Sequence, residues 1–175
     1  MKKKIWLSAL FLVLVIGLYA QQNPVITTFI LVRHAEKMSS EESQKLMTGA
    51  DDPELKPEGQ ERAKRLAAML KNTTINAVYS TRYKRTKNTV APLAQEKGLE
   101  VQVYESMKAN DLDELIKKHS GQTVLVGGHS NTIPQIANTL IGKEEFKNFA
   151  DADYGNLIII SVTQRGSAKV TWLTY

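Results

Sequence analysis

The chain has 175 residues, 42% of them hydrophobic, and no cysteine, so it can bury one core of ordinary size and forms no disulfide or thiolate metal site. Its formal net charge is +5, but the first twenty residues hold three lysines and no acid, which leaves 20 basic and 18 acidic residues and a net charge of +2. No run of Lys and Arg is interleaved with aromatic residues, which argues against nucleic acid as a partner.

The first twenty residues have the pattern of an export signal. Three lysines precede an apolar run over residues 5–20. The run is short for a membrane span, and small Ala20 before a polar segment is typical of a cleavage site, although Leu18 is larger than a signal peptidase prefers. We therefore expect residues 1–20 to be a signal peptide, or else a retained N-terminal anchor. Residues 21–175 would then be a single exported domain, periplasmic or secreted.

A buried strand and a polar segment follow. Residues 25–32 are β-branched or apolar almost without a break, which predicts a central strand buried on both faces. Residues 37–58 are polar and contain Gly49, Pro53 and Pro57, which indicates a long loop near the end of that strand. Long loops in this position often cover binding sites.

The rest of the chain alternates helices with strands. Apolar spacing predicts helices over residues 57–72 and 83–97, around 112–116 and over 133–140. Strands are predicted over residues 75–79, 99–104 and 123–127. The chain closes with a predicted hairpin of residues 157–162 and 168–173. This alternation predicts a three-layer α/β/α fold, with a mostly parallel central sheet and an antiparallel edge.

Three polar clusters follow predicted strands: Arg33-His34, residues 80–85 and residues 129–132. Ligands of open α/β sheets bind at the carboxyl ends of the strands, so these clusters are expected to converge. A neutral imidazole can attack phosphorus while fixed guanidinium groups stabilise the charge on the phosphoryl oxygens. The clusters therefore favour phosphoryl transfer without a metal or a cofactor.

Four segments of the chain resemble the histidine phosphatase superfamily, also called phosphoglycerate mutase-like. Leu31-Val32-Arg33-His34-Ala35-Glu36 is similar to its signature, with Ala35 in place of the usual glycine. Residues 52–63 are similar to the segment before its first helix, and residues 79–89 to its Ser-Ser-Asp-x-x-Arg-[Ala/Thr]-x-x-Thr segment. Gly128-His129-Ser130-Asn131 matches its second histidine segment.

The resemblance implies a role for each matching residue. His34 would accept the phosphoryl group, and Arg33, Arg85 and His129 would form the pocket that holds it. Ser130 and Asn131 are further candidates for substrate binding. The substrate would be a phosphorylated small molecule or a phosphoprotein, with no metal and no cofactor involved.

The proton donor for the leaving oxygen is the least defined part of the pattern. Most related proteins supply a Glu shortly after the third strand, and Glu105 is the nearest candidate, although the residues around it differ from the usual context. Asp111 and Asp153 are weaker candidates.

Arg82 competes with Arg85 for the second cationic position, but it falls where many members have Asp and is expected to be a solvated loop charge.

Other functions stay open at this stage. A non-catalytic module that binds a phosphorylated ligand would also fit, as would a phosphoglycerate mutase-type phosphotransferase, although export argues against the latter. Residues 128–132 resemble the nucleophile elbow of serine hydrolases, but they lack the final glycine, and no histidine follows Ser130. His119, at a predicted helix end, is expected to cap that helix. The sequence leaves the substrate and the oligomeric state undetermined.

Overall fold

A computed structural model describes residues 24–46 and 51–175 of the chain. The expected signal peptide and its cleavage site lie outside the described residues. Among the helices of the described ranges, none combines the length and the apolar composition needed to cross a membrane.

The described residues build one six-stranded sheet with the strand order β3-β2-β4-β1-β5-β6. Parallel ladders join β1 to β4, β4 to β2 and β2 to β3, whereas β5 runs antiparallel to both β1 and β6. The mostly parallel sheet with an antiparallel edge is confirmed, as is the central place of the first strand. The strands are β1 (Thr27–Arg33), β2 (Ala77–Ser80), β3 (Val101–Val103), β4 (Thr123–Gly128), β5 (Asn156–Gln164) and β6 (Ser167–Thr174).

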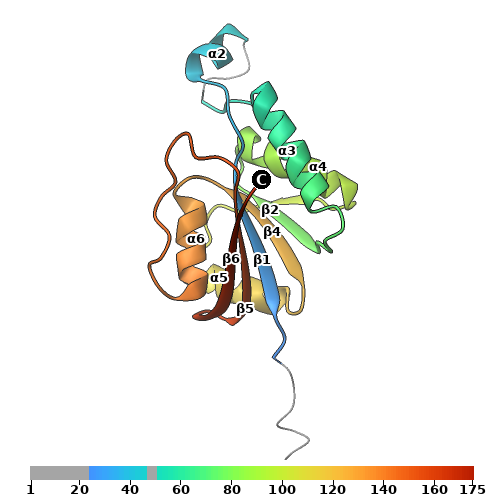
Figure 1. Cartoon of the computed structure of the whole chain (residues 1–175), viewed down its shortest axis with the longest axis vertical. Coiled ribbons are helices and arrows are strands. Elements are labelled where there is room, and N and C mark those ends of the chain that lie inside the picture. The colour runs from blue at the N-terminus through green and yellow to red at the C-terminus, as the bar shows by residue number, and fades with distance from the viewer. Residues whose placement is uncertain (1–23, 47–50) are drawn as a thin grey trace, which may run out of the picture.

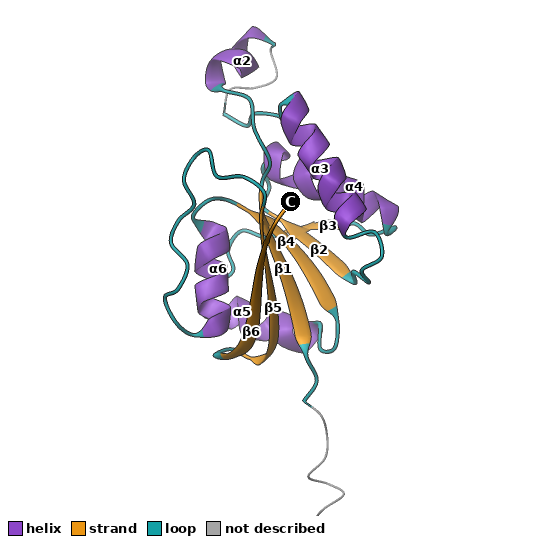
Figure 2. Cartoon of the chain, viewed as in Figure 1, coloured by secondary structure: helices purple, strands orange, loops and turns teal. Residues whose placement is uncertain are grey.

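Helices cover both faces of this sheet (Figures 1 and 2). The long helices are α3 (Pro57–Met69), α4 (Lys84–Glu96), α5 (Ala109–Lys118) and α6 (Thr132–Ile141). Side chains alternate along β1, so Phe29 and Leu31 join the core under α5 and α6, while Ile30 and Val32 join the core under α3 and α4. By the same alternation, Arg33 lies on the α6 side of the sheet.

The segment predicted as one long loop, residues 37–58, contains more structure than expected. A short helix, α2 (Ser40–Lys45), begins after Ser39, whose hydroxyl accepts a hydrogen bond from the Glu42 amide while the Glu42 carboxylate accepts one from the Ser39 amide. A bridge between Lys37 and Leu55 closes the two ends of the segment. The prediction of a loop throughout was therefore wrong, because the capping box Ser39-x-x-Glu42 starts a helix.

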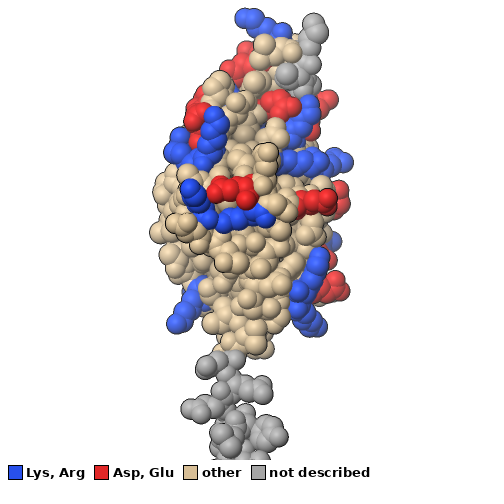
Figure 3. Space-filling view, turned by 90° about the vertical axis from the view of Figure 1, so that its right-hand side faces the viewer, with Lys and Arg blue, Asp and Glu red and all other residues tan. Residues whose placement is uncertain are grey.

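Charged side chains of both signs are interspersed on the face shown in Figure 3. An extended polyanion would require a single basic patch, and Lys and Arg do not gather into one on that face.

Candidate active site

The two histidines of the predicted site come together at the carboxyl edge of the sheet. His34 directly follows β1, and its amide donates a hydrogen bond of 2.8 Å to the carbonyl of Gly128 at the end of neighbouring β4. His129 follows Gly128, so the β1–β4 ladder places both imidazoles at the same edge. Their ring centroids are 5.4 Å apart in an edge-on arrangement.

His34 is buried, and its imidazole has one nitrogen engaged. Its Nδ1 lies 2.8 Å from the carbonyl oxygen of Ala35, which can only accept, so Nδ1 carries the proton and Nε2 has the free lone pair. The pKa of His34 is lowered to about 3, mainly by burial, with the charges of Arg85, His129 and Arg33 acting in the same direction and the Ala35 hydrogen bond opposing them. The imidazole is therefore a neutral base at physiological pH.

His129 is held neutral in the same way. Burial lowers its pKa to about 4, with the charges of Arg85 and Arg33 acting in the same direction. Its Nε2 lies 3.0 Å from the hydroxyl of Thr81 at the end of β2, and its amide donates to the hydroxyl of Thr132. Thr81 therefore links the ends of β2 and β4 beside His34.

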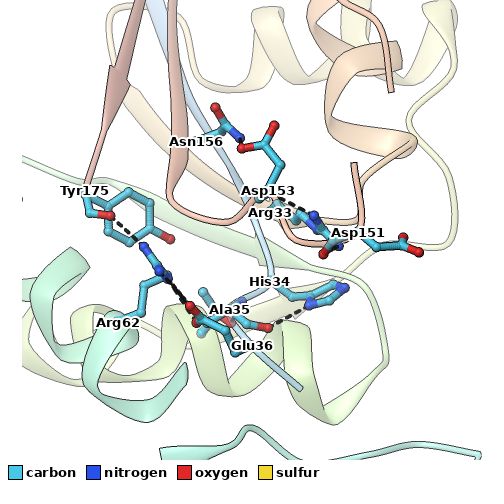
Figure 4. Close-up of polar contacts among 10 residues, drawn as sticks. Arg33, His34, Ala35, Glu36, Arg62, Asp151, Asp153, Asn156 and Tyr175 are labelled. Carbon is cyan, nitrogen blue, oxygen red and sulfur yellow. Dashed lines mark hydrogen bonds and ion pairs between the residues drawn. The ribbon is translucent and has the colours of Figure 1, made fainter. Parts of the chain in front are cut away.

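The guanidinium of Arg33 is held by the chain that follows α6 (Figure 4). Its Nη1 donates to the carbonyls of Ala150 and Asp153 at 2.6 and 2.8 Å, and its Nη2 donates to the carbonyl of Asp151 at 3.1 Å. The Nε–H of Arg33 is buried and has no hydrogen-bond partner among the described residues. This placement follows from the position of Arg33 on the α6 face of β1.

Arg85 lies in the first turn of α4, and its guanidinium keeps its charge largely uncompensated. Its Nε–H is buried without a hydrogen-bond partner in the part of the chain that the structure describes, and its ion pair with Asp52 is 3.9 Å long. Because the donors of a buried guanidinium are normally satisfied, these orphaned Nε–H groups of Arg33 and Arg85 are well suited to an anion. The charges of both residues act on His34.

The rest of the signature is fixed by hydrogen bonds to α3 and α4. The Ala35 amide donates to the hydroxyl of Thr89, which itself donates to the carbonyl of Arg85. The Glu36 carboxylate accepts three contacts of 2.6 to 3.0 Å from Arg62, which also donates to the main-chain oxygen of Tyr175 (Figure 4). These contacts hold the backbone on either side of His34.

Glu105 lies on the His129 side of the site. It is exposed, and with His129 it lines a hollow of about 250 Å³. The two weaker candidates are engaged elsewhere, because Asp111 accepts a hydrogen bond from the Lys108 amide at the start of α5, and Asp153 accepts one from the side chain of Asn156. Of the three carboxylates considered, Glu105 alone lines this hollow.

Four other predicted residues lie as follows. Ser130 is partly buried next to His129, and its carbonyl accepts from the amide of Phe149, whereas Asn131 is exposed and lines a separate hollow of about 570 Å³. The structure thus does not bring Asn131 to the histidine pair. Arg82 is exposed, as expected of a solvated loop charge. His119 is the C-cap residue of α5, as predicted, and contacts Tyr79 and Gln122.

Two aromatic residues of the site were not recognised from the sequence. The ring of Tyr83 lies 5.3 Å from that of His129, and the ring of Tyr154 lies 6.1 Å from that of His34. Tyr83 stands within the matched segment and could have been noted there. Tyr154 belongs to an irregular stretch with no pattern that marks it. Among the described residues, no group of three or more His, Cys, Asp or Glu side chains is arranged to hold a metal ion.

The fold and this edge of the sheet define an α/β protein with two neutral histidines flanked by guanidinium groups. A family model for the histidine phosphatase superfamily (branch 1) matches residues 29–112. The match covers 84 of the 175 residues and includes Arg33, His34 and Arg85, while His129 lies beyond it. A search of curated proteins found no match.

Solved structures with the same fold extend the likeness over most of the chain. Phosphoserine phosphatase from Entamoeba histolytica in complex with 3-phosphoglyceric acid has a TM-score of 0.65 at 19% identity, over 85% of this chain and 97% of its own. The mycobacterial glucosyl-3-phosphoglycerate phosphatase has a TM-score of 0.63 at 13% identity, over 86% of this chain and 98% of its own. The protein histidine phosphatase SixA complexed with tungstate has a TM-score of 0.64 at 13% identity, over 84% of this chain and 96% of its own. The described residues thus have the phosphoglycerate mutase-like fold.

Proposed function

We propose that this chain is a metal-independent histidine phosphatase, which hydrolyses a phosphomonoester or another phosphorylated substrate through a phosphohistidine at His34. One observation carries the proposal: a buried, neutral His34 has its Nδ1 proton bound to Ala35 and its Nε2 free, beside two guanidinium groups with orphaned donors. The family match and the phosphatases among the structural neighbours support it.

The reaction would proceed in two displacements. Nε2 of His34 attacks phosphorus, the bond between phosphorus and the leaving oxygen breaks, and that oxygen takes up a proton. Arg33, Arg85 and His129 stabilise the charge on the equatorial oxygens. Water then attacks the phosphohistidine and gives a proton to the carboxylate that donated the first one, the bond between nitrogen and phosphorus breaks, and inorganic phosphate leaves while Nε2 regains its lone pair.

Glu105 is the proposed source of the first proton. Its place in the hollow beside His129 supports this role. Glu105 is exposed, so it can exchange its proton with solvent. A leaving group that departs easily needs little protonation, so substrates with acidic leaving groups would depend least on Glu105.

Release of nitrophenol from p-nitrophenyl phosphate in the presence of EDTA tests the proposal. The purified protein is expected to turn over this ester, and His34→Ala is expected to abolish turnover. Activity that survives His34→Ala would refute the assignment of the nucleophile. Among the described histidines, the buried C-cap residue His119 lies outside the site, so His119→Gln is a control that should retain turnover after correction for folded protein.

Two further measurements beside this assay separate the two alternative functions. A module that only binds a phosphorylated ligand would show saturable phosphate binding in a calorimetric titration with no turnover of any ester. A mutase-type phosphotransferase would return the phosphoryl group to the substrate, and its isomerisation would be stimulated by 2,3-bisphosphoglycerate.

We also propose that residues 1–20 direct export, with cleavage after Ala20 or retention as an anchor. Three lysines followed by a short apolar run support this proposal. Cell fractionation with N-terminal sequencing of the mature protein should find the domain outside the cytoplasm. A full-length chain in the cytoplasmic fraction would contradict the proposal.

A further inference from the structure

Two tyrosines flank the two histidines of the site. The ring centroids of Tyr154 and His34 are 6.1 Å apart, those of His34 and His129 are 5.4 Å apart, and those of His129 and Tyr83 are 5.3 Å apart. The site thus has an aromatic ring on each side of the histidine pair.

Each tyrosine also lies against one of the site guanidinium groups. The central carbon of the Arg33 guanidinium is 4.3 Å from the centroid of Tyr154, and that of Arg85 is 4.5 Å from the centroid of Tyr83. Both distances fall well within the range in which a cation is attracted to an aromatic ring. Each tyrosine therefore contacts one histidine and one guanidinium of the site, and Tyr83 also lies 5.4 Å from the guanidinium carbon of exposed Arg82.

A ring holds a guanidinium in a different way from a carboxylate. The ring attracts the cation without accepting its N–H groups in the plane and without cancelling its charge. Arg62 shows the opposite case in the same protein, because its Nε and Nη2 both donate to the Glu36 carboxylate and its charge is paired. Within residues 24–46 and 51–175, the ion pair of Arg85 is the longer one of 3.9 Å with Asp52. Arg85 thus keeps donors and charge available for an anion.

Core packing does not account for the two tyrosines. Both are only partly buried, and neither belongs to the hydrophobic clusters formed by the described residues. Tyr83 directly precedes α4, and Tyr154 precedes β5, so two separate elements bring the rings to the histidines.

We propose that Tyr83 and Tyr154 are positioning residues for the phosphoryl group. Tyr83 orients the Arg85 guanidinium and Tyr154 that of Arg33, each through its ring face, so that the charges and free donors of both arginines are directed at the same anion. This inference rests on the proposed function for its place in catalysis, but it makes a separate claim about anion binding.

Calorimetric binding of inorganic phosphate to the purified protein tests the claim without requiring turnover. Tyr83→Leu is expected to raise the dissociation constant about 3- to 30-fold, the range of a partly desolvated cation–ring contact. Tyr83→Phe, which keeps the ring, should recover most of the affinity. The control is Tyr79→Phe, which removes a tyrosine hydroxyl bound to His119 and Lys118 and should leave phosphate binding unchanged.

A double-mutant cycle separates positioning from a general structural effect. If Tyr83 acts through Arg85, Tyr83→Leu should cause no further loss of phosphate affinity in the Arg85→Ala background. An equal loss in both backgrounds, or no loss in the wild-type background, would overturn the proposal. Tyr154→Leu with Arg33→Ala forms a second, independent cycle that decides the question if one leucine variant does not fold. Phosphate binding that follows this pattern without ester turnover would leave the positioning claim standing and refute the proposed function alone.

Discussion

His34 and His129 are uncharged because burial and the neighbouring arginines make a further positive charge unfavourable. The same arginines would attract an anion, so in the proposed function one arrangement would both keep His34 deprotonated and bind the phosphoryl group that it attacks. The Nδ1 proton of His34, bound to the carbonyl of Ala35, determines which ring nitrogen is free.

The low pKa of His34 makes stability depend on pH. Its pKa is about 3 in the folded chain and near 6.5 when unfolded, so the unfolded state binds more protons below pH 6.5 and stability falls as the pH falls towards 3. Between pH 7 and pH 5 the free energy of unfolding should fall by about 2 kcal/mol more for the wild type than for His34→Gln, because glutamine at position 34 does not titrate. Urea denaturation at both pH values measures this difference. Parallel losses in the two proteins would contradict the pKa assignment.

Arg85, in the first turn of α4, and Arg82, just before that helix, should differ sharply in their effect on activity. Arg85→Ala removes a cation with orphaned donors beside His34 and is expected to lower kcat/KM for p-nitrophenyl phosphate by about 10²- to 10³-fold. Arg82→Ala removes an exposed guanidinium three residues away and should change kcat/KM by less than about threefold. A larger loss for Arg82→Ala than for Arg85→Ala would assign the second cationic position to Arg82.

At the scale of elements, the site depends on how closely α3 and the backbone after β1 approach each other. Gly59, in the first turn of α3, packs against the backbone of Glu36, and an added Cβ there would lie 2.3 Å from the Glu36 carbonyl oxygen. The Lys56 amide also donates to this oxygen. Gly59 therefore allows the helix to dock directly behind the signature.

Gly59→Ala is expected to destabilise the protein by about 1 to 3 kcal/mol, because the backbone must move to admit the methyl group. Helix preference alone predicts the opposite sign, since Ala is favoured over Gly by about 1 kcal/mol inside a helix. Chemical denaturation should show this loss, whereas exposed Gln60→Ala on the same turn should stay within about 0.5 kcal/mol of the wild type. A Gly59→Ala protein as stable as the wild type would show that the contact is not tight.

The elements with strong local patterns were predictable from the sequence. The apolar run that forms β1 and the spacing of α3, α4 and α6 agree with the structure to within a few residues. The short helix α2 was missed although Ser39 and Glu42 stand at capping-box spacing, because six residues are too few to show an apolar stripe. Pairing of Glu36 with Arg62 was not predicted, since it depends on tertiary packing.

At the scale of the whole molecule, the strand order explains why distant segments meet. The parallel β1–β4–β2 ladder places the residues after three strands at one edge, which the position of each polar cluster in the sequence allowed us to predict. The loop that binds Arg33 was not predictable in this way. It acts through the main-chain carbonyls of residues 150–153, and a carbonyl is the same in every residue.

The most direct test of the account is to identify the phosphorylated residue during turnover. The purified protein is mixed with p-nitrophenyl phosphate, quenched in alkali and analysed by peptide mass spectrometry, because phosphohistidine survives base and is lost in acid. The account predicts one base-stable, acid-labile phosphoryl group on His34, absent from His34→Ala. A phosphoryl group on another residue, or turnover with no phosphorylated enzyme under rapid quenching, would contradict it.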